Sequence, residues 1–201
     1  MGSEMCIRDS PVDVGFQPDC GGQRADAQTA QGVMISFDDI ERALRRRTFG
    51  TLSTLTEHGA PHATGVVYAV SAPGEPLALY VTTRTTTRKV RNLRVHPDVA
   101  FVVPVPHRFV PAFPPAAIQF MGTATVVAAG DEGAERAFES SWFLRRILAT
   151  ERRIVTEGGD LCFIRIRPDG MLFTYAMGMS VLDVVRRPRG AIGRVAIPAG
   201  R

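Results

Sequence analysis

The hydrophobic and polar positions of the chain follow helical spacing before Phe49 and mostly strand-like spacing after it. Ser36, with an acidic residue three positions later, forms a capping-box pattern at the start of a helix. Phe37, Ile40 and Leu44 then recur at the intervals of one helix face. We therefore predict a short amphipathic helix that begins after Ser36 and precedes the first strand.

From Phe49 onward, short runs of β-branched and aromatic residues alternate with turn sequences, and the regions Thr85–Val95 and Asp131–Thr156 return to helical spacing. The connections between strands are too short for the crossovers of a parallel sheet. The pattern predicts a mainly β fold with flanking helices, a six-stranded antiparallel split barrel. Gly122 marks a bend or bulge in one long strand. The expected strands are Phe49–Leu55, His62–Val70, Leu77–Thr82, Val99–Val103, Ala117–Ala129 and Leu161–Arg167, with Met171–Tyr175 as a closing strand or hairpin partner.

The two ends of the chain lack this periodicity. Residues 1–31 have no sustained pattern, which is typical of a disordered or non-native extension. We expect the barrel domain to span residues 32–185 and a C-terminal tail to span residues 186–201. The proline-rich segment Pro104–Pro115 is expected to be an irregular loop.

Charge and composition narrow the classes of partner. The net charge is +4, but the 24 basic residues are interleaved with 20 acidic ones, so we expect no nucleic-acid partner. No apolar run approaches the roughly 20 residues that span a bilayer, and no secretory signal is evident. We therefore expect a cytoplasmic protein without a membrane partner. The three cysteines lack metal-type spacing, and Gly59 and Pro61 favour a turn between His58 and His62, so no metal site is expected.

The segment that follows Leu79 carries the clearest candidate chemistry. A strand ends in Thr82 and Thr83, a hydroxyl-rich turn leads to Thr87, and Arg88 and Lys89 begin a helix. Backbone N–H groups, hydroxyls and two cations around one point suit a phosphate. Cations at a helix N-terminus also oppose the helix dipole unless an anion lies nearby. The alternative, on the residues alone, is a solvated loop in which Thr87 simply caps the helix.

The order of these features resembles the flavin-phosphate segment of the pyridoxamine 5'-phosphate oxidase-like split barrels. The likeness extends in element order from residue 36 to residue 175, and it is strongest from Thr82 to Pro97. It implies that the Arg-Lys pair holds the phosphate of FMN and that the strand at residues 64–68 presents its main chain to the isoalloxazine ring, with Val66 beside the ring. The cofactor-binding residues implied or expected in this way are Thr64, Gly65, Val66, Val67, Thr82, Thr83, Thr87, Arg88 and Lys89.

The resemblance further implies a flavin-dependent oxidoreductase that transfers hydride through FMN, or a deazaflavin coenzyme, to a small substrate. It also implies a homodimer. The basic residues that the oxidase carries at both ends of the Thr64–Ala69 strand are absent, and Ala117 stands where the oxidase has a glutamine. These departures argue for a substrate other than pyridoxamine phosphate. A non-enzymatic flavin-binding or haem-binding sensor or storage protein on the same barrel stays open as the alternative.

No catalytic residue can be assigned from the sequence. The side chains that could donate a proton are Tyr68, Tyr80, His62 and His107. Tyr175–Ser180 is soft enough to form one wall of a substrate pocket, or is ordinary core and turn. A single apolar helix stripe is expected to pack on the barrel or on a second subunit, and it consists of Phe138, Trp142, Phe143, Ile147 and Leu148.

Overall fold

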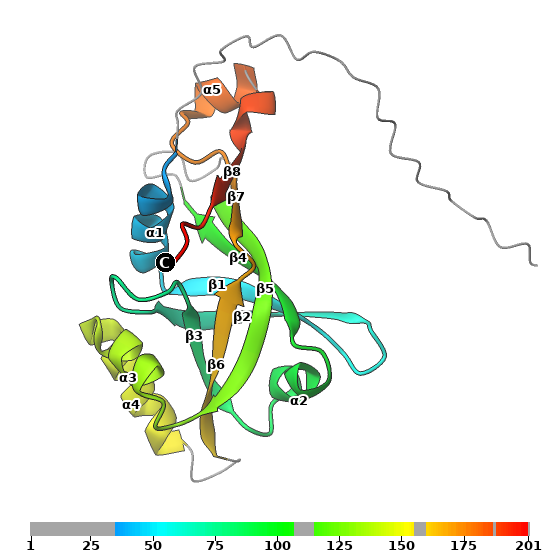
Figure 1. Cartoon of the computed structure of the whole chain (residues 1–201), viewed down its shortest axis with the longest axis vertical. Helices are drawn as coiled ribbons and strands as arrows, with labels where there is room; N and C mark the ends of the chain where they lie inside the picture. The colour runs from blue at the N-terminus through cyan, green and yellow to red at the C-terminus, as the bar shows by residue number, and fades with distance from the viewer. Residues whose placement is uncertain (1–34, 107–114, 155–159, 187, 201) are drawn as a thin grey trace, which may run out of the picture. The chain divides into compact units, whose positions relative to one another are not determined.

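Six antiparallel strands close into a barrel in the computed structural model, which describes residues 35–106, 115–154, 160–186 and 188–200 (Figure 1). The barrel order is β1-β2-β3-β6-β5-β4, and it closes because β4 pairs with both β5 and β1. The predicted mainly β fold with a six-stranded antiparallel barrel is confirmed. The barrel strands are β1 (Phe49–Leu55), β2 (Pro61–Val70), β3 (Leu79–Arg84), β4 (Asp98–Val105), β5 (Ala116–Ala128) and β6 (Leu161–Pro168).

Two further strands extend the sheet outside the closed barrel. The sequence predicts that Met171–Tyr175 closes the barrel or pairs with the strand before it. In the structure this segment, β7, pairs instead with β5, and β8 (Ile192–Ala196) pairs with β7. The segment expected to be a tail thus contributes a strand, preceded by helix α5 (Val181–Arg186) and the 3-10 helix η2 (Pro188–Ala191). The expectation for residues 1–31, and most of that for the proline-rich loop, falls outside the described residues.

Helix α1 (Phe37–Arg45) forms as the sequence predicts. The Ser36 hydroxyl accepts a hydrogen bond from the backbone N–H of Asp39, and the Asp39 carboxylate accepts one from the backbone N–H of Ser36. The apolar face of the helix joins the barrel core, in which Ile40 and Leu44 are fully buried. Tyr68 of β2 ties this end of the barrel to the helix by donating a hydrogen bond of 2.9 Å to the Leu44 carbonyl oxygen.

Helix α2 (Arg88–Val95) follows β3 and packs its apolar side against the same core. Val90 and Leu93 are its buried apolar residues. The buried Asn92 amide donates a hydrogen bond of 2.8 Å to the Thr54 hydroxyl near the end of β1. This bond holds α2 against β1.

Helices α3 (Glu132–Glu139) and α4 (Trp142–Ile154) cover one outer side of the barrel (Figure 1). The prediction of one apolar stripe is wrong, because the helical region is interrupted at Ser140 and Ser141. The Ser141 hydroxyl accepts a hydrogen bond from the backbone N–H of Leu144 and so starts a new helix with a different buried face. Of the predicted stripe, Phe138 and Leu148 are buried, whereas Trp142 is 68% exposed.

Candidate functional site

A row of side chains crosses the outer surface of β1, β2, β3 and β6. Phe49 pairs with Val67, and Thr82 pairs with Phe163. Tyr68 pairs with Val81, so the neighbouring residues Val67 and Thr82 lie side by side with their side chains on the opposite, outer face. Phe163 and Val67 pack against the helices α3 and α4. The row therefore places the Thr82 hydroxyl between two apolar neighbours.

The Thr82 hydroxyl has no hydrogen-bond partner in the structure although its oxygen is buried. A buried hydroxyl without a partner costs about 1–3 kcal/mol, and such groups are rare in folded proteins. The residue as a whole is only half-buried. This combination is what a hydroxyl that meets a ligand would show.

The Thr83 and Thr87 hydroxyls at the turn between β3 and α2 bond to groups outside the helix. The Thr87 hydroxyl donates a hydrogen bond of 3.0 Å to the Arg84 carbonyl oxygen. It also lies 3.2 Å from the hydroxyl of Thr83. Thr87 occupies the N-cap position, yet its side chain accepts no hydrogen bond from the helix. The simple capping role that the sequence leaves open for Thr87 is therefore absent.

The N-terminus of α2 consequently carries positive charge without a side-chain cap. No acidic residue lies in its first turn, which begins with Arg88 and Lys89. Burial lowers the pKa of the Lys89 ammonium, although the negative charge of Glu151 acts in the opposite direction. No carboxylate in the described part of the chain comes within ion-pair distance of either cation. The free N–H groups, the helix dipole and the half-buried ammonium together favour an anion here.

The residues that the resemblance selects on β2 divide between the two faces of the strand. Gly65 and Val67 lie on the outer face, where the Phe49 ring covers Gly65: a Cβ built on Gly65 would lie 2.9 Å from the Phe49 Cζ. Val66 is 6% exposed and belongs to the barrel core, and Thr64 pairs with the core residue Leu52. The Val66 side chain thus faces away from the outer surface, and Val67 is the apolar side chain available to a ring there.

Thr83 likewise turns its side chain toward the barrel interior, where it is 5% exposed and contacts Thr87. Sequence reasoning missed Phe49, which is 54% exposed on the outer face beside Val67. Its position as the first residue of an alternating strand is the signal that could have identified it, because strand residues in odd positions share one face.

The candidate proton donors that the structure describes are buried or half-buried. Tyr68 is fully buried, and burial raises the pKa of its phenol. Tyr80 is 6% exposed, and burial and the nearby Asp131 carboxylate raise the pKa of its phenol. Burial also raises the pKa of the Cys162 thiol, which disfavours a reactive thiolate. His62 is half-buried on the inward face of β2, and His107 falls outside the described residues.

The described residues contain neither a cluster of metal-ligating side chains nor a membrane-spanning helix. Among them, no group of three or more His, Cys, Asp or Glu side chains gathers in a way that could hold a metal ion. No helix in the same part of the chain has the length and apolar character needed to cross a membrane.

The Tyr175–Ser180 segment contains the buried residue Ala176, whose φ of 54° is the left-handed value that non-glycine residues seldom adopt.

Comparison of the sequence with protein families matches residues 37–175 to the family described as pyridoxamine 5'-phosphate oxidase. No curated protein matches the chain. The fold is similar to that of HutZ, a haem storage protein from Vibrio cholerae, with 18% identity and a TM-score of 0.52 over 69% of this chain and 94% of that one.

Two further solved structures share the fold. A conserved hypothetical protein from Mycobacterium tuberculosis is 23% identical, with a TM-score of 0.52 over 74% of this chain and 86% of that one. A pyridoxamine 5'-phosphate oxidase-related, FMN-binding protein from Nostoc punctiforme is 13% identical, with a TM-score of 0.50 over 81% of this chain and 96% of that one. At these identities the likeness establishes the fold alone.

Proposed function

We propose that this chain, which belongs to the pyridoxamine 5'-phosphate oxidase family, binds a phosphorylated flavin and acts as an oxidoreductase on a small substrate. FMN is the expected cofactor, with the deazaflavin coenzyme as the alternative. The observation that carries the proposal is the buried, unpartnered Thr82 hydroxyl on the outer face of β3. The helix α2, whose N-terminus has no side-chain cap, begins six residues later in the chain. A hydroxyl, free N–H groups and cations are the groups that hold a phosphate ester.

The residues present fit such a cofactor. Lys89 and Arg88, with the N–H groups of the first turn of α2, would hold the phosphate, and Thr82 would donate or accept a hydrogen bond beside it. Phe49 and Val67 offer apolar surface to a planar ring beside Gly65, whose lack of a side chain leaves room for the Phe49 ring. A bound flavin supplies hydride transfer, and the protein supplies its orientation and the exclusion of water.

A homodimer is part of the proposal. Phe49 is 54% exposed and Met121 of β5 is 66% exposed, so the outer surface of the barrel retains large apolar side chains that a second subunit would cover. Light scattering at micromolar concentration should report about twice the chain mass of 21.8 kDa. A monomer that still binds flavin tightly would rule out a cofactor site shared between subunits.

The first experiment is the absorption spectrum and mass of the ligand that co-purifies with the full chain. A flavin or deazaflavin spectrum that a nicotinamide donor bleaches supports the oxidoreductase. A flavin that no donor reduces supports the non-enzymatic alternative. A haem Soret band supports a haem-binding protein, in keeping with the haem storage protein HutZ among the structural neighbours.

The second experiment removes the two cations. The double change Arg88→Ala with Lys89→Ala should weaken FMN binding by about tenfold to a hundredfold for each lost charge-assisted contact. Riboflavin, which lacks the phosphate, should bind the parent chain and the double variant with equal weakness. Arg94→Ala is the matched control, because Arg94 lies in the last turn of the same helix and should leave FMN affinity unchanged. An unchanged FMN affinity in the double variant would place the phosphate elsewhere.

A further inference from the structure

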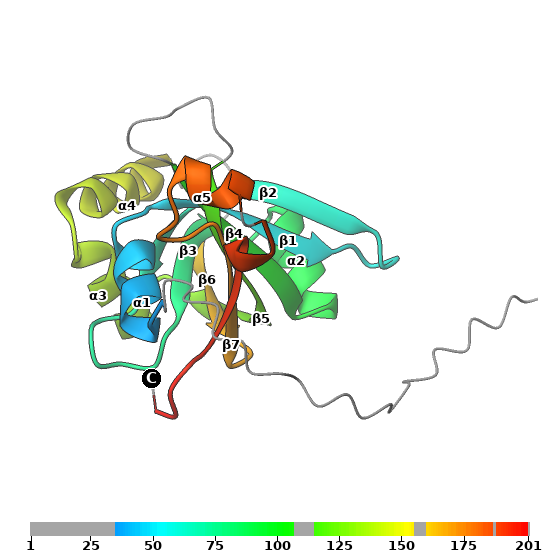
Figure 2. The ribbon, with the colours of Figure 1, turned by 90° about the horizontal axis from the view of Figure 1, so that it is seen from above.

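A pocket of about 280 Å³ lies between the β1–β2 turn and α2. Figures 1 and 2 both show this turn projecting from the barrel beside α2. The turn is well ordered, because the Thr56 N–H donates to the Ala60 carbonyl oxygen at 2.8 Å and the Thr56 hydroxyl accepts from the Ala60 N–H at 3.1 Å. The pocket is lined by Thr56, Glu57, His58, Arg88, Arg91, Asn92 and Val95.

One face of α2 forms the helical wall of the pocket. Arg88, Arg91 and Val95 follow one another at three- and four-residue intervals, so they stand above one another on the helix. Asn92, on the same face, is held by its hydrogen bond to Thr54 and makes this wall rigid. Lys89 lies about 100° further round the helix and outside the pocket lining. The two neighbouring cations therefore face different surroundings.

The charges around the pocket favour an anion. Arg88 and Arg91 have no carboxylate within ion-pair distance in the described part of the chain, whereas arginines such as Arg45, Arg136 and Arg152 pair with glutamates. His58 of the turn adds its imidazole ring to the pocket lining, and Glu57 is the acidic residue in the same lining. Two guanidinium groups in one concave site bind phosphate-type oxyanions through charge-assisted hydrogen bonds.

We propose that this pocket is a second anion site, in which Arg91 binds a phosphate-type oxyanion together with Arg88. Arg88 is shared with the proposed flavin phosphate, whose other contacts are Lys89 and Thr82. The oxyanion is either free or a second phosphate carried by a ligand already bound at the start of α2. Either source presents the same tetrahedral group to the arginines. The proposal rests on the pocket itself and does not require that the bound cofactor be a flavin.

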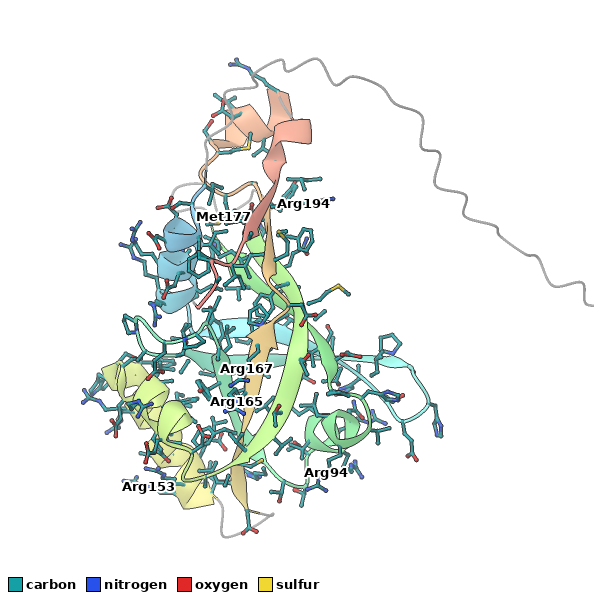
Figure 3. The ribbon with its side chains drawn as sticks, viewed as in Figure 1. Arg94, Arg153, Arg165, Arg167, Met177 and Arg194 are labelled. Atoms are coloured by element: carbon teal, nitrogen blue, oxygen red, sulfur yellow. The ribbon has the colours of Figure 1, made fainter. Side chains whose placement is uncertain are left out.

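The test is a calorimetric titration of the full chain with inorganic phosphate in phosphate-free and sulfate-free buffer. The flavin-free chain should bind phosphate saturably at the pocket. Arg91→Gln should weaken this binding by about tenfold to a hundredfold, as expected for the loss of a contact to a charged group. Arg94→Gln is the matched control on the same helix, and Figure 3 shows Arg94 projecting from α2. Because Arg94 does not line the pocket, this variant should bind phosphate like the parent chain.

Circular dichroism melts of both variants check that the fold is intact. Equal weakening by Arg91→Gln and Arg94→Gln would mean that phosphate responds to the general charge of α2, and it would overturn the proposal. The absence of saturable phosphate binding would overturn it as well. These outcomes are obtained without any flavin, so they are distinct from a failure of the proposed function.

Saturating flavin then separates the two sources of the oxyanion. If phosphate binding persists with FMN and with FAD, the pocket takes a free anion. If FAD displaces phosphate and FMN does not, the pocket takes the second phosphate of a ligand. If FMN itself displaces phosphate and Arg91→Gln weakens FMN binding, there is one phosphate site rather than two, and the second site is refuted.

Discussion

Replacing Thr82 by valine should make the flavin-free protein more stable and its flavin binding weaker. The substitution keeps the branched shape of the side chain and removes the buried hydroxyl that has no partner. An unsatisfied buried hydroxyl costs about 1–3 kcal/mol, so its removal should raise the free energy of unfolding by about 1 kcal/mol. For a domain of this size, 1 kcal/mol corresponds to an increase in Tm of about 2–4 °C.

The effect on the cofactor has the opposite sign. If the hydroxyl bonds to the flavin phosphate, its loss should weaken FMN affinity by about tenfold or more, the usual value for a hydrogen bond to a charged group. Ligand binding adds RT ln(1 + [L]/Kd) to stability, so at high FMN concentration the order of the two Tm values should reverse. Thermal melts with and without FMN, together with quenching of flavin fluorescence, measure both quantities.

Thr123→Val is the control, because Thr123 lies exposed on the outer face of β5, away from the β3–α2 junction. It should change neither Tm nor FMN affinity by a measurable amount. A Thr82→Val chain that is less stable than its parent would show that the hydroxyl makes a favourable contact in the free protein. A Thr82→Val chain that binds FMN with full affinity would show that the hydroxyl does not meet the cofactor.

Three further predictions concern the barrel and α2. Gly122→Ala should cost about 3 kcal/mol in urea unfolding, because a Cβ there would lie 2.3 Å from the Arg167 carbonyl oxygen, whereas Gly130→Ala, with nothing within 4 Å, should be nearly neutral. Asn92→Ala should cost about 1–3 kcal/mol, and a double-mutant cycle with Thr54→Val should show coupling between the two residues. Because the folded-state pKa of Lys89 lies below its ordinary 10.5, the unfolded chain binds more protons between these two values. Unfolding free energy should therefore rise with pH across that window in the parent chain and lose this contribution in Lys89→Met.

The alternation of residues on β2 illustrates what the sequence leaves undecided. Val66 and Val67 are both apolar, so polarity does not distinguish the inward from the outward face of this strand. The pairing of β1 with β2 decides it, since Gly50 opposite Val66 lies under the core ring of Phe101. The family resemblance therefore predicts which strand faces the expected ring, whereas the strand register is needed to tell which of its side chains lie on the outer face.

The interruption between α3 and α4 has a similar explanation. Neither proline nor glycine marks the break, and the sequence from residue 131 to residue 156 supports one continuous apolar stripe on periodicity alone. The first helix ends at its C-cap Ser140, and the Ser141 hydroxyl begins the second by accepting from the Leu144 N–H. Serine occurs both within helices and at their starts, so its role here depends on the packing of Phe138 and Leu144 on the barrel.

The sequence of α2 is unfavourable for a helix that binds no ligand. It contains Arg88, Lys89, Arg91 and Arg94 and no acidic residue, and each cation in the first turn opposes the dipole by about 0.3–1 kcal/mol. Thr87 adds no cap, and Lys89 is half-buried without a carboxylate within ion-pair distance in the described residues. When several locally unfavourable features, such as a missing cap and cations in the first turn, occur at one place, that place is usually a functional site. Because Arg88 and Lys89 diverge around the helix, a single phosphate beside Lys89 relieves only part of this unfavourable charge, and an anion between Arg88 and Arg91 relieves the rest.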